Sequence, residues 1–162
     1  MKFVAALLMS LCSLSALAAP APEPKQLVAL ATCQESWLDF QAAPAKGEAM
    51  RQLIEADYSA DPKGAGMAPK TKATLLGLPI TQLFPDSAGM AVGFSVSVEG
   101  KFADVKTRLE KQLGYKLEHC ESDDEMTTCE HQIAEKKTIA MVADGKGDLP
   151  ETLVGCVYYY EK

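Results

Sequence analysis

Apolar and polar residues follow a helical period in the part of the chain after residue 24. A stripe at spacings of three and four predicts one amphipathic helix from about residue 25 up to Pro44, which stops it. The stripe consists of Leu30, Cys33, Trp37 and Phe40. A second helix is predicted over residues 46–58, and the run Asp61-Pro62-Lys63-Gly64 follows as a breaker. Residues 59–71 are therefore expected to form a mobile loop.

The period changes to two after residue 72, and this change predicts strands. The clearest strand spans residues 89–98, with large apolar side chains on one face and small side chains on the other. Residues 76–80 also alternate, but Pro79 demotes them to an edge strand or an irregular segment. The helical period then returns over about 102–113, and Gly114 suits a left-handed helix end.

The rest of the chain predicts a hairpin and two more strands. Residues 115–120 and 129–133 would pair around an acidic segment, and the further strands cover 138–142 and 153–160. The whole pattern predicts an α+β domain. It would have two N-terminal helices, then a mainly antiparallel sheet of about five strands, with the helix at about 102–113 packed on one face.

The first eighteen residues have the pattern of an export signal. A short basic start precedes an apolar run, and Ala16 and Ala18 supply the small residues of a cleavage site. We predict that residues 1–18 are removed near Ala18, that residues 19–24 are a flexible lead, and that residues 25–162 form a single domain in the periplasm or outside the cell. The apolar run falls short of the roughly 20 residues that span a bilayer, so no stable membrane insertion is expected.

The cysteine count supports a disulfide framework. Removal of the signal takes Cys12 and leaves Cys33, Cys120, Cys129 and Cys156, an even set with three possible connectivities. We predict a bond between Cys120 and Cys129, since cross-strand neighbours at the mouth of a hairpin are close enough to be bridged. Cys33 would then pair with Cys156 and join the first helix to the last strand.

Charge and motifs exclude several classes of function. With 16 basic and 22 acidic side chains, the formal net charge is −6, which disfavours nucleic acid as a partner and allows a basic protein. The predicted hairpin register places His119 opposite Glu130, and His119 and His131 on opposite faces. Because the two histidines then cannot share a metal, and no paired cysteine or histidine motif is present, we expect no metal and no cofactor.

Catalytic motifs are also missing from the sequence. The run Gly93-Phe94-Ser95-Val96-Ser97 begins like a nucleophile elbow, but it ends in serine and lies inside a predicted strand. A glycosidase needs two carboxylates at a set separation, and 22 acidic residues single out no pair. We therefore expect a protein without enzymatic activity.

The strongest candidate for binding is the acidic segment 121–128 between two cysteines. Its four carboxylates belong to Glu121, Asp123, Asp124 and Glu125. A disulfide at its mouth would order the segment in advance and lower the entropy cost of docking, and its charge would steer a basic partner. Tyr158 and Tyr160 are further candidates, since tyrosine combines an apolar ring with a polar end.

These features predict an exported, non-enzymatic binding protein, an inhibitor or immunity protein for a basic secreted or cell-wall-acting protein. Small exported inhibitors of cell-wall hydrolases and periplasmic immunity proteins are similar in size, disulfide use and acidity. One alternative is an accessory or structural envelope protein that acts through the strand at 89–98 or the tyrosine-bearing C-terminal edge. Another is a hydrolase whose carboxylates are not yet assigned. Salt separates the first two, because it weakens docking by charge but not docking by an apolar face.

Overall fold

The computed structural model describes residues 24–62, 64, 66–86 and 92–159. The predicted signal peptide 1–18, all but the last residue of the predicted lead, and Tyr160 lie outside these residues. The described part contains four helices and nine strands, and all pairings between its strands are antiparallel. The predicted α+β class is confirmed, and the sheet has more strands than the five expected.

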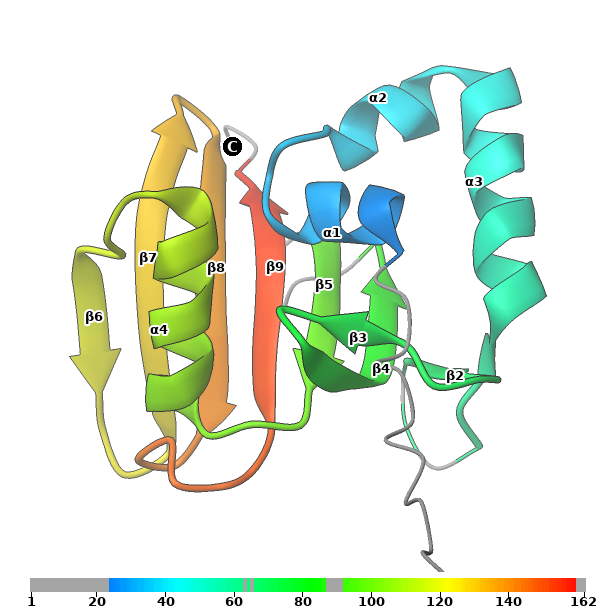
Figure 1. The fold of residues 1–162 in the computed structure, drawn as a ribbon. Helices are drawn as coiled ribbons and strands as arrows, with labels where there is room; N and C mark the ends of the chain where they lie inside the picture. Colours follow the sequence, from blue (N-terminus) through cyan, green and yellow to red (C-terminus); the bar gives the residue numbers. More distant parts are fainter. Residues whose placement is uncertain (1–23, 63, 65, 87–91, 160–162) are drawn as a thin grey trace, which may run out of the picture.

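The helices are α1 (Lys25–Ala31), α2 (Trp37–Ala42), α3 (Pro44–Asp57) and α4 (Phe102–Leu113). The strands are β1 (Tyr58–Ala60), β2 (Met67–Pro69), β3 (Thr74–Leu75), β4 (Leu78–Pro85), β5 (Val92–Val98), β6 (His119–Ser122), β7 (Met126–Ala134), β8 (Lys137–Asp144) and β9 (Thr152–Tyr158). Their order in the sheet is β1-β2-β4-β5-β9-β8-β7-β6, and β3 pairs with β4 outside this path. Figure 1 shows α1 and α4 in front of the same face of the sheet.

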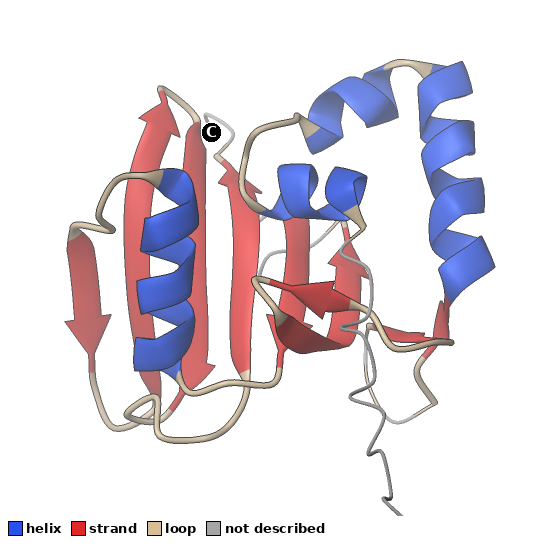
Figure 2. Ribbon diagram, viewed as in Figure 1, coloured by secondary structure: helices blue, strands red, loops and turns tan. Residues whose placement is uncertain are grey.

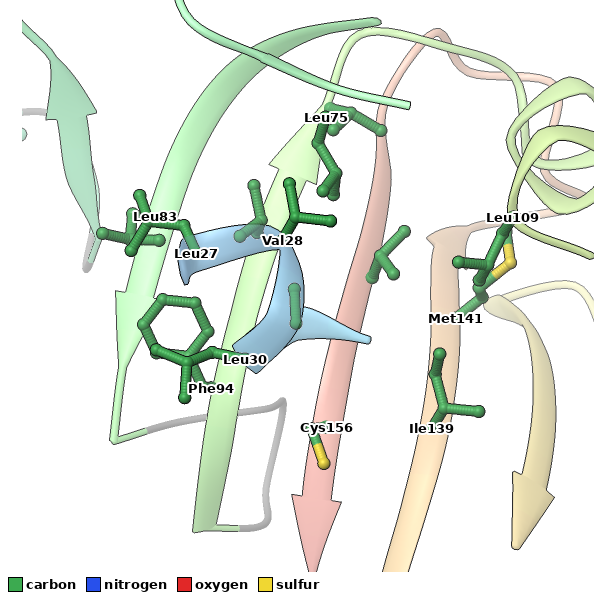
Figure 3. Packing of buried hydrophobic residues seen from close by; sticks show 14 of the residues in the cluster. Leu27, Val28, Leu30, Leu75, Leu83, Phe94, Leu109, Ile139, Met141 and Cys156 are labelled. Atoms are coloured by element: carbon green, nitrogen blue, oxygen red, sulfur yellow. The ribbon is translucent and has the colours of Figure 1, made fainter. Parts of the chain in front are cut away.

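The core lies between this face and the helices. Alternate residues of β5 and β9 point toward the helices, and Phe94, Val96 and Val154 among them are fully buried. Figure 3 shows Leu27 and Leu30 of α1 beside Leu83 and Phe94, while Leu109 of α4 lies next to Met141 of β8. Helices α1 and α4 and the sheet thus form two layers, and Figure 2 shows the remaining two helices to the side of them. Among the described helices, none is long and apolar enough to cross a bilayer.

The single helix predicted between residue 25 and Pro44 is wrong, because the chain turns at Cys33. Helix α1 ends at Ala31, and Cys33 has a left-handed backbone with φ of 60°. The Cys33 N–H donates to Leu30 O at 3.2 Å and the Gln34 N–H to Ala29 O at 2.8 Å, which closes the helix with the two hydrogen bonds of a Schellman motif. A second helix, α2, then starts at Trp37.

The second predicted helix is confirmed as α3, but the loop predicted after it is only partly present. Pro44 stands in the first turn of α3, where its missing N–H leaves no helical bond unmade. β1, which begins one residue before the predicted loop 59–71, pairs with β2 inside that loop over three residues each, and the two strands add a short hairpin to the sheet. Met67 of β2 then pairs with Leu83 of β4.

Strand β4 is an interior strand rather than the edge strand or irregular segment predicted around Pro79. It lies between β2 and β5, and Pro79 is tolerated near its start because the pairing with β5 begins only at Ile80. Pro79 pairs with Thr74 of the two-residue strand β3. Among the described residues, strand β4 pairs with β2 only at Leu83.

The strand and helix in the middle of the chain are confirmed. Residues 87–91 are not among the described residues. Strand β5 covers the part of the predicted 89–98 strand that is described. Helix α4 has the predicted bounds, and Gly114 caps it with φ of 78°. The later strands β6 to β9 follow the predicted order.

Both predicted disulfides are confirmed. Cys33–Cys156 ties the turn after α1 to β9 across 123 residues, and Cys120–Cys129 spans 9 residues between β6 and β7. The hairpin has the predicted register, with His119 opposite Glu130. The cysteines therefore fix the core and the acidic hairpin separately.

Candidate functional site

The acidic hairpin turn is shorter than the sequence suggested. Glu121 pairs with Thr128 and Ser122 with Thr127, so the strands continue beyond the cysteines into the segment predicted to be an eight-residue loop. Only residues 123–126 connect the last pair. The four predicted acidic side chains are thus carried by one strand and a tight turn.

Asp123 holds this turn with its own side chain. Its Oδ1 accepts the N–H of Met126 at 2.7 Å and the N–H of Glu125 at 2.8 Å, and its backbone N–H donates to Met126 O at 3.0 Å. The first two hydrogen bonds lower the pKa of the Asp123 carboxyl, with Met126 making the larger contribution. The turn is therefore ordered by bonds to an ionised carboxylate.

The turn is also fixed to the loop between β8 and β9. The Gly145 N–H donates to Glu125 O at 2.7 Å, and the Thr127 hydroxyl donates to Gly145 O at 2.8 Å. Because that hydroxyl proton is used, the Ser122 hydroxyl donates to Thr127 Oγ1 at 2.8 Å. Figure 1 shows both connections at the same end of the sheet.

Exposed carboxylates from both connections gather at this end of the molecule, which we call the acidic end. It comprises Glu121, Asp123, Asp124, Glu125, Asp144 and Asp148, all of them exposed. The Asp124 side chain is 92 % exposed, and its Oδ1 lies 3.4 Å from Lys146 Nζ. Since this ion pair is open to water, it contributes little to stability and leaves the excess of negative charge in place. The sequence indicated the first four members but not Asp144 and Asp148.

Tyr158, one of the two predicted tyrosines, does not join this site. Tyr158 is only 5 % exposed, and its hydroxyl accepts a hydrogen bond from the backbone N–H of Trp37 at 3.0 Å. It is a core residue that links β9 to the start of α2, so its position does not support the predicted contact with a partner. Tyr160 lies outside the described residues.

The groups considered for catalysis are dispersed in the fold. His131 packs against Tyr115 with ring centroids 4.4 Å apart on the helix-covered face, whereas His119 points to the other face. Ser95 is fully buried within β5, and Cys33, Cys120, Cys129 and Cys156 are all in disulfides. Within the described ranges, no cluster of three or more histidine, cysteine, aspartate or glutamate side chains is placed to hold a metal ion.

Comparison with known proteins assigns no family. No family model, curated protein or solved structure matches the chain.

The structure also forms a hollow that the sequence did not indicate. It has a volume of about 440 Å³ and lies on the sheet face opposite the helices. Phe84, Val142, Leu149 and Leu153 supply its apolar wall, and Asp144 connects it to the acidic end. These residues come from three strands and a loop, so no local pattern reveals the hollow.

Proposed function

We propose that this chain is an exported, non-enzymatic binding protein, an inhibitor or immunity protein that docks on a basic secreted or cell-wall-acting protein through its acidic end. The observation that carries the proposal is the fixed turn, in which Asp123 accepts two backbone hydrogen bonds while Asp124 and Glu125 are exposed.

A fixed acidic surface suits this role for two reasons. Side chains on an ordered backbone lose less entropy on docking than those on a mobile loop, so more of the interaction energy appears as affinity. The concentrated negative charge attracts a basic partner over distance and raises the association rate. A lysine or arginine of the partner would replace Lys146 beside Asp124. Because that ion pair is exposed to solvent, breaking it costs little free energy.

The test separates charge from turn structure. The variant Glu121→Gln/Asp124→Asn/Glu125→Gln removes three charges and leaves Asp123 to hold the turn. After affinity capture of a partner from envelope and secreted extracts, the association rate should fall by about tenfold or more at low salt, and by much less at high salt.

A matched control removes three exposed charges elsewhere. Asp39→Asn/Asp57→Asn/Glu135→Gln changes the net charge equally, and none of these residues belongs to the acidic end. It should bind nearly as well as the unmodified protein. Equal losses in the two triple variants would contradict the proposal, because net charge alone would then explain the binding.

The hollow on the sheet face opposite the helices favours a second candidate, an accessory envelope protein that docks by an apolar contact. Its wall contains Phe84 and Leu153, both partly exposed. A partner held there should remain bound as salt rises, since apolar contacts do not weaken with ionic strength. Loss of that partner on Leu153→Ser, with retention by the triple acidic-end variant, would favour this role over the first.

A further inference from the structure

A second hollow, at the other side of the molecule, has the character of a ligand cleft. It lies between α2, α3 and the end of β4, with a volume of about 270 Å³. Its apolar lining consists of Trp37, Phe40, Ile54, Met67 and Pro85. In Figure 1, α2 and α3 stand far from the β6–β7 turn, so this cleft is separate from the acidic end.

One aromatic wall of the cleft is held rigidly. The Trp37 ring packs against Phe94 of β5 at a centroid distance of 5.2 Å and stacks on Phe40 at 6.5 Å. Its indole N–H donates to Asp86 Oδ1 at 2.7 Å. Trp37 lines the cleft and is only 7 % exposed, so its ring is held by its neighbours and is not free to rotate.

A carboxylate stands at the mouth of the cleft. Asp86 Oδ1 accepts both the Trp37 indole N–H and the Gln41 side-chain amide. The backbone of Asp86 is left-handed, with φ of 68°, a conformation that costs energy for a residue with a side chain. The hydrogen bonds from Trp37 and Gln41 fix the carboxylate beside the apolar lining.

The charged side chains at the rim of the cleft carry more negative than positive charge. Arg51 is the cation of the lining, and it pairs with Glu48 at 2.7 Å and with Glu55 at 2.5 Å. Two carboxylates thus compensate one guanidinium, and Asp86 adds a further negative charge. This excess of negative charge would repel an anionic ligand, whereas it would attract a cationic ligand.

We propose that this cleft binds a small organic amine, a single ring or short aliphatic chain that bears one ammonium group. The apolar body would lie against Trp37, Ile54 and Met67, and the ammonium group would lie at the mouth between Asp86 and Glu55. The volume is just below the roughly 300–1,000 Å³ of pockets for drug-sized ligands, which sets the ligand to fragment size.

The single tryptophan of the chain makes the binding measurable. Three probes that share one apolar body, 2-phenylethylamine, 2-phenylethanol and 3-phenylpropionate, are titrated into the oxidised full chain while Trp37 fluorescence and binding heat are recorded. The amine should give a saturable change in both signals, with affinity about tenfold or more above that of either analogue. Equal affinity for all three probes, or a lack of saturable binding by the amine, would overturn the proposal.

The charge of Asp86 is tested by Asp86→Asn. Asparagine keeps an oxygen for Trp37 and Gln41 and tolerates a left-handed backbone, so the fold of the cleft is preserved. The variant should lose about tenfold or more in affinity for the amine and little for 2-phenylethanol. Asp104→Asn, a neutralised carboxylate on α4, is the control and should bind the amine unchanged. Equal amine affinity in Asp86→Asn and in the control would contradict the assignment of Asp86 to the ammonium group. Glu55→Gln tests the second carboxylate at the mouth in the same way, and its glutamine keeps an oxygen for Arg51.

Discussion

Cys33 shows how one residue meets two incompatible demands. Its left-handed backbone, with φ of 60°, closes helix α1 in a position that usually belongs to glycine. Glycine has no side chain, however, and the bond to Cys156 requires one. The disulfide thus keeps a residue with a conformational penalty at the helix end. No sequence pattern marks this conflict, and for that reason an uninterrupted helix was predicted.

The penalty at Cys33 can be measured apart from the disulfide. In the absence of the bridge, Cys33→Gly/Cys156→Ser should be more stable than Cys33→Ser/Cys156→Ser by about 1 kcal/mol, because glycine adopts a positive φ without strain. Urea unfolding of the two variants gives the comparison. A serine variant as stable as the glycine variant would show that the left-handed backbone carries no cost here.

Tyr58 has a buried hydroxyl without a hydrogen-bond partner. The side chain is 2 % exposed, and removal of an unpaired polar atom from a core is neutral or favourable. Tyr58→Phe should therefore raise the free energy of unfolding by up to about 1 kcal/mol at neutral pH. A loss of 1 kcal/mol or more would show that the hydroxyl has a partner in solution, such as a water molecule.

The same residue predicts a loss of stability at alkaline pH. Burial, assisted by the charge of Asp57, raises the pKa of Tyr58 from 10.0 to about 12. Since the pKa is higher in the folded protein, the folded state keeps the proton longer, and stability falls as pH rises from about 10 to about 12. Tyr58→Phe should flatten this part of the stability curve, whereas an unchanged slope would assign the loss to other groups.

At the scale of elements, strong periodicity was a reliable guide and short pairings were not. Helix α4 and strand β5 repeat large apolar residues over at least three periods, and both were predicted. Strands β1 and β2 have three residues each, without alternation, and they join the rest of the sheet through the pairing of Met67 with Leu83 of β4. Elements that depend on such tertiary pairing leave no local signal.

Glu110 fixes the end of α4 to the segment that follows. It is 7 % exposed and accepts hydrogen bonds from Lys106, from Lys116 Nζ at 2.7 Å and from the Leu117 N–H at 3.0 Å. Burial opposes its ionisation, but the three donors outweigh it and lower the pKa of Glu110 from 4.5 to about 2. The ionised carboxylate is therefore part of the folded structure.

Glu110→Gln should reduce the free energy of unfolding by about 2 kcal/mol at neutral pH, since the charge-assisted hydrogen bonds are lost. The pKa is lower in the folded protein, so the contribution is present above about pH 4.5 and disappears as pH falls through about 2. Unfolding curves of both proteins across this range should converge at the acid end. A constant difference at all pH values would instead indicate a packing defect.

At the scale of the whole molecule, the sequence revealed the chemistry of the surface better than its shape. Asp123, Asp124 and Glu125 are adjacent in the chain, so their clustering was visible. The acidic end as a whole also needs the β8–β9 loop, which reaches the turn through the Gly145 hydrogen bond. The cleft at Trp37 combines α2, α3 and two strands. Surfaces assembled from separate elements become visible only when the sheet order is known.

The two disulfides should contribute unequally to stability. The Cys33–Cys156 bond closes a loop with a sequence separation of 123, against 9 for Cys120–Cys129, and the chain-entropy model assigns about 2 kcal/mol more to the longer loop. Removal of the longer bridge in Cys33→Ser/Cys156→Ser should therefore lower the free energy of unfolding more than Cys120→Ser/Cys129→Ser does. Denaturant curves of the two double variants give the ranking.

Accessibility reinforces the difference between the bridges. Cys33 is 5 % exposed and Cys156 is fully buried, whereas Cys120 in β6 is exposed. A thiol reductant must reach a sulfur atom to attack, so under native conditions it should open the hairpin bridge first, and the core bridge only after unfolding. Mass spectrometry of peptides alkylated during a reduction time course identifies the order. Earlier reduction of the core bridge would mean that α1 separates from β9 in the folded state, and that the two-layer core is less tightly closed than its burial indicates.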